Sequence, residues 1–230
     1  MITKNETSVL IEEKDKEKLF VFYGEFFLHS VRVSAWARAI AKALNYGEAN
    51  VNKLFWAGMW HDIGKLLVMD TIFLDDLSEG QMEVLNKHAE FSFDILVESG
   101  EYITPEILGL VLFHHIHPDG TGYPRVEGLA SEKLQILSAA DILDAMTHER
   151  HYRNGKINNK EDAIVYLRGC KYEERILAAI EKIDLEEKDL PDFFPPTNIK
   201  IAYTEKNGLK VEIEGKIFET KLRVLNEQGC

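Results

Sequence analysis

Eight side chains in this sequence have the donor types that bind first-row transition metals. Five are histidines and three are carboxylates, in the chain order Glu25, His29, His61, Asp62, His88, His114, His115 and Asp141. Imidazole and carboxylate are natural ligands of iron, manganese and zinc. A single histidine such as His88 is more often a surface or core residue, so the interpretation as a metal centre depends on the whole ordered set.

Two spacings favour a shared site. Glu25 and His29 are four residues apart, so a helix places both side chains on one face. His61 and Asp62 are adjacent, which allows the histidine to bind one metal ion while the aspartate bridges two. Glu25 has a second interpretation, as a structural carboxylate that pairs with Arg32. Two metal ions held together would activate a water molecule and bind the oxygens of a phosphodiester.

Helical periodicity predicts the elements that position these side chains. Apolar residues recur at steps of mostly three, four and seven from Lys16 to Leu44, and Gly47 is expected to cap the end of that helix. Further helices are expected at 48–60, 78–98, 105–115, 131–149, 159–167 and 173–183. The helix over 48–60 delivers His61 and Asp62 at its end, and the helix over 105–115 delivers the histidine pair.

The composition changes at residues 190–198, LPDFFPPTN, which hold three of the six prolines. After this segment apolar and polar residues alternate, and Asn207-Gly208 and Glu214-Gly215 are hairpin turn signals. We therefore expect a mainly α protein with an N-terminal tail over 1–15, a helical domain over 16–190 and a small antiparallel β meander within 191–230. A sheet this small is only marginally stable by itself. We therefore expect it to pack on the helices or on a second chain.

Length, charge and cysteine content exclude several classes of protein. A chain of 230 residues with 45% hydrophobic residues suits one medium domain, and the formal net charge of −12 disfavours binding to a DNA or RNA duplex. Cys170 and Cys230 lie outside any CxxC motif, so a reducing cytoplasm is the expected location. We expect no signal peptide, membrane span or preceding sensor domain. Regulation would then come through the meander, a homodimer or a separate protein.

The ordered motifs resemble those of the HD-domain phosphohydrolases, and in particular the HD-GYP subgroup. HDIGK at 61–65 and HH…DGTGYP at 114–124 are its two name-giving motifs, and SAADILDAMTHERHYR at 138–153 is similar to the segment that follows them. The resemblance covers about residues 20–185. It implies an HD-domain helical bundle with two or three divalent metal ions, iron first and manganese second. The implied reaction is hydrolysis of cyclic di-GMP to pGpG, GMP or both.

The resemblance also implies roles for single residues. Asp141 matches the metal-binding aspartate of the family, Asp62 is the bridging ligand, and Glu25 resembles an added carboxylate of three-metal members. Asp144 is interpreted as a supporting or capping residue. Lys65 is expected to reach the phosphate or to protonate the leaving group, with a surface lysine as the alternative. The implied substrate contacts are Lys65, Gly122, Tyr123, Pro124, Arg150 and Arg153.

The loop after the histidine pair has an alternative interpretation as an ordinary turn, since its glycines also suit such a turn. It departs from the family as well, because Ile116, His117 and Pro118 stand where Glu-Arg-Trp is usual. Gln135 replaces a usual arginine, and the stretch after HDIGK is shorter than usual. These differences bear on substrate and rate more than on metal binding. The alternative functions are a phosphohydrolase for another cyclic dinucleotide or nucleotide, and a degenerate metal-containing signalling or interaction protein.

Overall fold

The computed structural model describes the backbone of residues 13–68, 77–99, 103–126, 128, 130–148, 158–186, 189–190, 199–204, 208–213 and 216–221. Side chains are described from residue 25 to residue 190 within those ranges. The chain divides into two compact units, Val21–Phe193 and a second unit that joins Met1–Phe20 to Phe194–Cys230. All eight candidate ligands belong to the larger unit.

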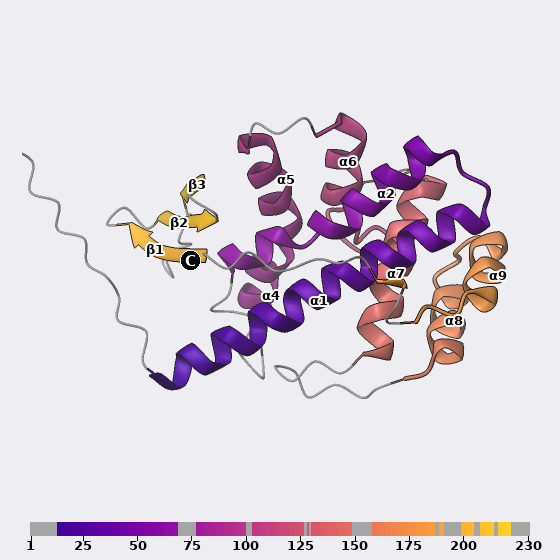
Figure 1. Ribbon diagram of the computed structural model, residues 1–230, viewed down its shortest axis with the longest axis horizontal. Helices are drawn as coiled ribbons and strands as arrows, with labels where there is room; N and C mark the ends of the chain where they lie inside the picture. Colours follow the sequence, from indigo (N-terminus) through magenta and orange to yellow (C-terminus); the bar gives the residue numbers. More distant parts are fainter. Residues whose placement is uncertain are drawn as a thin grey trace, which may run out of the picture. The chain divides into compact units, whose positions relative to one another are not determined.

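The larger unit is built from helices, as predicted. They are α1 (Glu13–Ala43), α2 (Glu48–Trp60), the short 3-10 helix η1 (Ile63–Leu67), α4 (Glu79–Asn86), α5 (His88–Glu98), α6 (Pro105–Phe113), α7 (Glu132–Thr147), α8 (Lys160–Gly169) and α9 (Glu174–Lys182). In Figure 1, α5 lies beside α6 and α8 lies beside α9, in agreement with their contacts. No helix in the described ranges has both the length and the apolar character needed to cross a membrane.

Polar caps set the starts of four helices, because each supplies an acceptor to a backbone N–H that has no partner within the helix. Ser78 forms a reciprocal capping box with Gln81 at the start of α4. The side chains of Thr104, Ser131 and Asn159 accept from backbone N–H groups at the starts of α6, α7 and α8. These three starts agree with the sequence predictions to within a residue.

The prediction of one continuous helix over 78–98 is wrong. This stretch is divided at Lys87 into α4 and α5. The imidazole of His88 donates from Nδ1 to the carbonyl oxygen of Leu85 at 2.7 Å, so a side chain bonds a carbonyl in the last turn of α4. The division makes His88 the first residue of α5, where its side chain is buried.

The cap predicted at Gly47 is also wrong. The left-handed residue after α1 is Asn45, with a φ of 62°, and Gly47 has an ordinary extended conformation at the start of α2. Asparagine adopts the left-handed region more readily than most residues because its short polar side chain bonds locally. α1 and α2 then approach closely, since a Cβ on Gly58 would lie only 2.7 Å from the Cα of Ser34.

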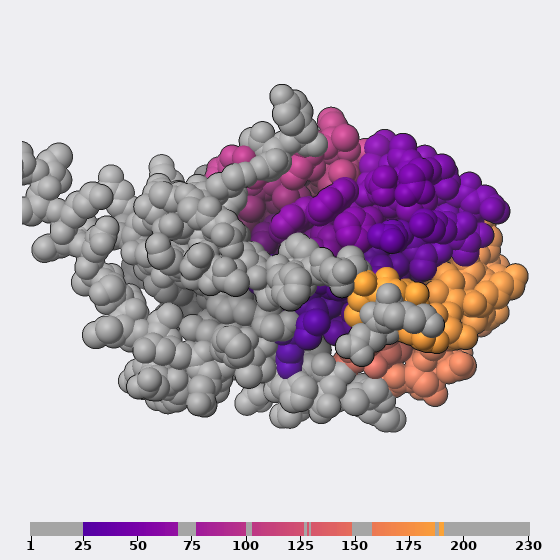
Figure 2. Space-filling view, in the orientation of Figure 1, coloured from indigo at the N-terminus to yellow at the C-terminus, as the bar shows by residue number. Residues whose placement is uncertain are grey.

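α7 is the central helix of the larger unit and packs against α2, α6 and α8. Ten of its sixteen residues are buried, which is the pattern of a helix enclosed by others rather than one with a solvent face. Its buried aliphatic residues include Ile136, Leu137 and Leu143, all with no exposed surface. Figure 2 shows residues from early helices, in indigo to purple, and from late helices, in orange, meeting on one surface.

Three strands follow in the second unit: β1 (Ile199–Thr204), β2 (Gly208–Ile213) and β3 (Lys216–Lys221). They form an antiparallel sheet in the order β1-β2-β3, in which Val211 pairs with Ile201 on one side and with Phe218 on the other. Their side chains, the proline-rich residues 191–198 and most of the predicted turn residues lie outside the described residues. The packing of this sheet is therefore still a prediction.

Candidate metal centre

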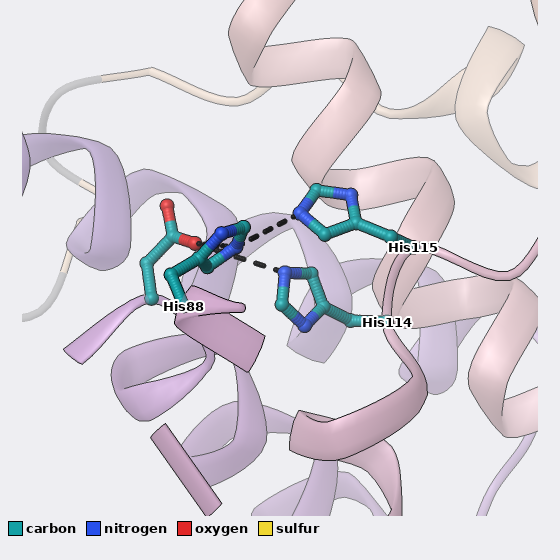
Figure 3. A group of neighbouring side chains, drawn as sticks. His88, His114 and His115 are labelled. Carbon is teal, nitrogen blue, oxygen red and sulfur yellow. Dashed lines mark hydrogen bonds and ion pairs between the residues drawn. The ribbon is translucent and has the colours of Figure 1, made fainter. Parts of the chain in front are cut away.

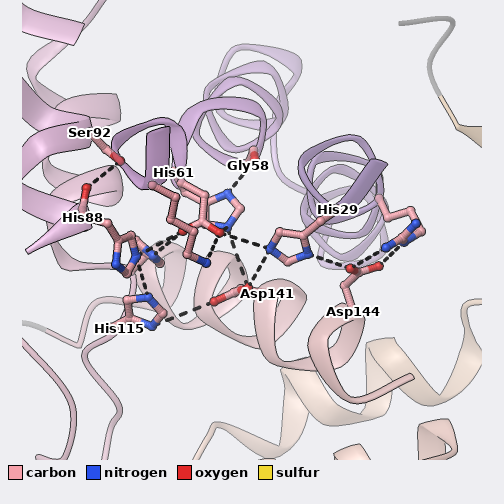
Figure 4. Close-up of polar contacts among 12 residues, drawn as sticks. His29, Gly58, His61, His88, Ser92, His115, Asp141 and Asp144 are labelled. Carbon is pink, nitrogen blue, oxygen red and sulfur yellow. Dashed lines mark hydrogen bonds and ion pairs between the residues drawn. The ribbon is translucent and has the colours of Figure 1, made fainter. Parts of the chain in front are cut away.

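Seven of the candidate ligands converge from five helices and one turn. Figure 4 labels five of them, His29, His61, His88, His115 and Asp141. α1 contributes His29, α5 His88 and α7 Asp141. The end of α2 and the turn before η1 contribute His61 and Asp62, and the end of α6 contributes His114 and His115. Six of these seven side chains are buried, and His115 is partly exposed.

Asp62 lies between two sets of imidazoles. Its Oδ1 is 3.1 Å from Nε2 of His88 and 3.7 Å from Nε2 of His114. Its Oδ2 is 3.4 Å from Nε2 of both His29 and His61. The two oxygens of one carboxylate therefore face different histidines, which is the arrangement expected of a ligand shared by two cations.

Two compact groups of ligand atoms share Asp62, and a third joins His61, His114 and Asp141. In one of the two that share Asp62, the atoms of His29, His61 and Asp62 all lie within 4.8 Å of one another. In the other, the same limit joins Asp62 to His88, His114 and His115. Figure 3 shows these last three imidazoles facing one another, with 3.0 Å between Nε2 of His88 and Nε2 of His115. We call the two groups that share Asp62 the His29 position and the His88 position.

Asp141 also lies between the groups. Its Oδ1 is 3.2 Å from Nε2 of His29 and 3.7 Å from Nε2 of His61. Its Oδ2 faces Nδ1 of His115 at 3.9 Å. α7 therefore places a second carboxylate where it can serve either position.

Backbone carbonyls orient three of the histidines. His61, His88 and His114 each donate from Nδ1 to the carbonyl oxygen three residues earlier, at 2.8, 2.7 and 2.6 Å. On a neutral ring this leaves Nε2 as the unprotonated nitrogen. Holding the other ring nitrogen is the usual way in which proteins aim a metal-binding histidine.

The donor set fits divalent transition metals. Nε2 of His61 and Nε2 of His114 are buried and have no hydrogen-bond partner among the described residues. Buried polar atoms are normally bonded because leaving them without a partner costs free energy. Aligned nitrogen lone pairs beside two carboxylates are what iron, manganese or zinc would satisfy.

The electrostatics favour metal-binding protonation states for His114, His115 and Asp62 but not for His61, whose pKa burial lowers but the neighbouring Asp62 raises above its usual value. Burial lowers the pKa of His114 to about 4, and burial also places the pKa of His115 well below its usual range. Burial opposes ionisation of Asp62, but the neighbouring His61 and Lys65 outweigh it and hold the pKa of that carboxyl well below normal. Ionised carboxylates and neutral imidazoles can accept a metal without first losing a proton.

The glycine and lysine of the HDIGK motif have distinct structural roles. A Cβ on Gly64 would lie 2.1 Å from the carbonyl oxygen of His88, so only glycine lets η1 pack this closely on α5. The Gly64 N–H donates to Oγ of Ser92 at 2.8 Å, and this serine was not identified from the sequence. Lys65 donates from Nζ to Oδ2 of Asp62. Its side chain is thus at the edge of the cluster.

The loop after the histidine pair folds back over His115. Gly120 and Gly122 have φ values of 85° and 101°, and a Cβ on Gly122 would lie 1.8 Å from the carbonyl oxygen of His115. The positive φ values let the backbone reverse at these two glycines. The ring of Tyr123 then lies over His115, with 4.5 Å between ring centroids and 33° between planes. Pro124 follows directly.

Two departures from the family pattern have structural partners. His117 bonds through Nδ1 to the hydroxyl of Tyr172 at 2.9 Å, and that hydroxyl lies 2.7 Å from Oγ of Ser138 on α7. His117 is therefore attached to the protein rather than only facing solvent. Gln135 bonds both the backbone N–H and the carboxylate of Glu173, so it joins α7 to the start of α9.

Other predicted site residues are not brought into the groups. Glu25 belongs to neither of them among the described side chains. Arg150 and Arg153 lie outside the described residues. Arg32 donates to the carboxylate of Asp144, so the supporting role expected of Asp144 agrees with its contacts.

Comparison with known proteins identifies similar chains. The HD domain family model matches residues 26–146. A cyclic di-GMP phosphodiesterase of Thermotoga maritima is 31% identical over 204 residues, covering 77% of this chain and 55% of that protein. A 3'3'-cGAMP-specific phosphodiesterase of Vibrio cholerae is 35% identical over 144 residues, covering 60% of this chain and 30% of that protein. A crystal structure of the HD domain of the L. monocytogenes phosphodiesterase PgpH has 16% identity and a TM-score of 0.47. The match covers 71% of this chain and 85% of that chain. The chain spans about half or less of the length of the two curated relatives.

Proposed function

The chain belongs to the HD-domain family, and we propose that it is a metal-dependent phosphodiesterase that hydrolyses cyclic dinucleotides. Cyclic di-GMP is the proposed first substrate, with pGpG, GMP or both as products. The observation that carries the proposal is the Asp62 carboxylate, whose oxygens face separate sets of imidazoles. Relatives named as phosphodiesterases of two cyclic dinucleotides support the same class of substrate.

In this proposal, Asp62 bridges two divalent metal ions, with iron as the first choice and manganese as the second. His29 and His61 complete one position, and His88, His114 and His115 complete the other, with Asp141 available to both. Bound metal ions would supply a hydroxide near neutral pH and positive charge for the phosphodiester oxygens. The protein's part is to hold carboxylates and neutral imidazoles in place without reorganisation.

Lys65 is the proposed source of the proton for the leaving oxygen. Its ammonium group donates to Oδ2 of Asp62 at the edge of the cluster, so it is close to where the reacting phosphate would lie. A positioned general acid of this kind is worth about 10²–10⁴-fold in rate. The same group could instead bind a phosphate oxygen.

Substrate contacts are proposed for the loop and for the segment after α7. Tyr123 lies over His115, so it can form a wall of the pocket beside the His88 position, with Gly122 and Pro124 next to it. Arg150 and Arg153 are proposed to bind phosphate or guanine, because the guanidinium fork donates two parallel hydrogen bonds.

Two alternatives remain in view. The segment Ile116-His117-Pro118 differs from the usual family sequence, and one relative is named for 3'3'-cGAMP, so another cyclic dinucleotide or a nucleotide is the second candidate substrate. The third candidate is a degenerate protein that binds metal but signals through a partner. Product analysis separates all three.

The test is an anaerobic incubation of iron- or manganese-loaded protein with cyclic di-GMP, 3'3'-cGAMP and GMP, with products resolved by chromatography. We expect cyclic di-GMP to be converted to pGpG or GMP, and Asp62→Ala to lose both this activity and at least one metal ion. Asp94→Ala is a suitable control because Asp94 is an exposed residue of α5. Metal-loaded parent protein that leaves every substrate intact would contradict the proposal.

A further inference from the structure

Asp144 is a fully buried carboxylate on α7, one helical turn after Asp141. Its Oδ2 accepts from Nδ1 of His29 at 2.6 Å and from Nη2 of Arg32 at 3.1 Å. Its Oδ1 accepts from Nε of Arg32, and Nδ1 of His148 lies 3.0 Å from that oxygen. Both oxygens are therefore occupied by cationic or polar donors, as Figure 4 shows for His29.

From these contacts we infer that Asp144 is a positioning residue that sets the metal affinity of the His29 position and leaves the His88 position unaffected. This inference rests on the proposed two-metal site. Because a carboxylate can only accept, Nδ1 of His29 carries the proton and Nε2 is the nitrogen turned toward Asp62 and Asp141, at 3.4 and 3.2 Å. A carboxylate on the far side of the ring also makes that nitrogen a stronger donor to a metal.

The selective effect of Asp144 on the His29 position follows from the groups that accept hydrogen bonds from the other histidines. His61, His88 and His114 are oriented by neutral backbone carbonyls, whereas His29 is oriented by the Asp144 carboxylate. His29 belongs to the His29 position and not to the His88 position. A change at Asp144 should therefore act on one metal ion of the pair.

Arg32 stabilises the buried charge of Asp144. The described contacts of Asp144 are to His29, Arg32 and His148, and the side chains of the last two are 17% and 40% exposed. Removing one partner of a buried ion pair leaves an uncompensated charge, whereas removing both charges together is often neutral for stability. The double variant Asp144→Ala with Arg32→Met therefore tests orientation of His29 without leaving Arg32 unpaired.

The experiment measures Mn²⁺ binding to the full chain by equilibrium dialysis, together with the electron paramagnetic resonance spectrum of the bound Mn²⁺. Asp144→Asn can still accept from His29, so we expect about tenfold weaker binding at one position. The double variant lacks the acceptor for Nδ1 of His29. Its Mn²⁺ affinity at the His29 position should fall by up to about 100-fold, which is the upper range for the loss of such hydrogen-bond partners. The other position should keep its affinity, and the signal of a coupled pair should give way to that of a single ion.

Asp94→Asn, at an exposed position of α5, is the matched control and should bind Mn²⁺ at both the His29 and the His88 positions with the affinity of the parent. Thermal unfolding without metal identifies a variant that does not fold. If Asp144→Asn does not fold, the Mn²⁺ affinity of the double variant is the deciding measurement. Unchanged affinity at both positions, or equal weakening of both, would overturn the role of Asp144 and leave the proposed function intact. A parent protein that binds no Mn²⁺ would overturn both.

Discussion

Four imidazoles of the cluster have one nitrogen held by an oxygen acceptor and the other turned toward Asp62. Backbone carbonyls hold three of them, and the Asp144 carboxylate holds His29. Because the orienting bonds come from the protein itself, the rings need not reorganise when a metal arrives. The ligand geometry is therefore a property of the folded chain, and single residues can be tested for separate contributions to metal binding and substrate binding.

Tyr123 is predicted to act on the substrate and not on the metal. Replacing it with alanine removes the ring that lies over His115. We expect about tenfold lower kcat/KM for cyclic di-GMP, at the lower end of the ~1–3 kcal/mol that stacking of a base on an aromatic ring contributes. Hydrolysis of bis-p-nitrophenyl phosphate and metal content should be nearly unchanged, because that ester makes few remote contacts.

The control for Tyr123→Ala is Tyr123→Phe, which keeps the ring and should keep most of the activity. Arg150 and Arg153, replaced singly by alanine, should show the same difference between the two substrates. Equal losses on the dinucleotide and on the small ester would argue against a dinucleotide pocket at this loop.

Glu25 is predicted to hold a third metal ion. On α1 it lies one turn before His29, so a helix brings the two side chains together. We expect about three metal ions per chain in protein purified without oxygen, as the added carboxylate implies by its resemblance to the HD-GYP subgroup, and one fewer in Glu25→Ala, measured by elemental analysis. Glu90→Ala, at an exposed position of α5, is the control. Two metal ions in parent and variant alike would show that Glu25 is a structural carboxylate.

At the scale of elements, η1 and α5 pack closely beside the metal centre. Gly64 of η1 lies against the backbone of His88 and Ser92, with no room for a side chain. The same contact sets the distance between the Asp62 turn and the first turn of α5. Packing of these two elements is therefore coupled to the geometry of the His88 position.

Gly64→Ala is predicted to destabilise the protein by about 1–3 kcal/mol, the usual cost of overpacking a tight contact. Its added Cβ would lie 2.1 Å from the carbonyl oxygen of His88, so His88 must move and binding at the His88 position should weaken. Urea unfolding and metal titration measure the two effects. Gly109→Ala in α6 meets nothing within 4 Å and should instead stabilise by about 0.5–1 kcal/mol. A neutral Gly64→Ala would contradict the packing argument.

Across the whole larger unit, long-range polar contacts hold the helices around the centre. Glu106 at the start of α6 accepts from Lys53 of α2 and from Lys133 of α7. Hydrogen bonds from these lysines lower the pKa of Glu106 below its ordinary value of 4.5. Because the folded-state pKa is depressed, the stabilisation is present above the ordinary pKa and is lost as pH falls through the folded value.

Glu106→Gln should therefore be less stable than the parent at pH 7, and the two should converge as the solution is acidified below the lowered pKa of Glu106. We expect a difference of about 0.5–1 kcal/mol at pH 7, because the side chains are partly exposed and salt screens the pairs. Urea unfolding across this pH range measures it. Glu161→Gln, an exposed residue of α8, should show little difference at any pH. A Glu106→Gln deficit that persists undiminished in acid would contradict the electrostatic origin.

The second unit, with β1 to β3, is the part of the molecule whose role is still a prediction. Its alternating sequence predicts an apolar face that packs on the helices or on a second copy of the chain. A homodimer or a regulatory partner would give this unit a function in control of the site. The seven clustered ligands all belong to the larger unit.

The sequence by itself determined most of the helices, the starts of α6, α7 and α8 and the residue types of the centre, because caps, periodicity and donor chemistry act over a few residues. Thr104, Ser131 and Asn159 begin helices where local rules place them. The glycines of the loop were identified for the same reason, since a positive φ is a local requirement. The motif order then indicated which donors belong together.

Only the tertiary structure decided how those donors face one another. Asp62 divides its oxygens between His29 and His88, which come from helices far apart in the chain. Asp144 holds His29 across 115 residues, a pairing that no local spacing encodes. Such contacts arise from packing of distant segments, so their geometry exists only once α1, α2, α5, α6 and α7 have come together.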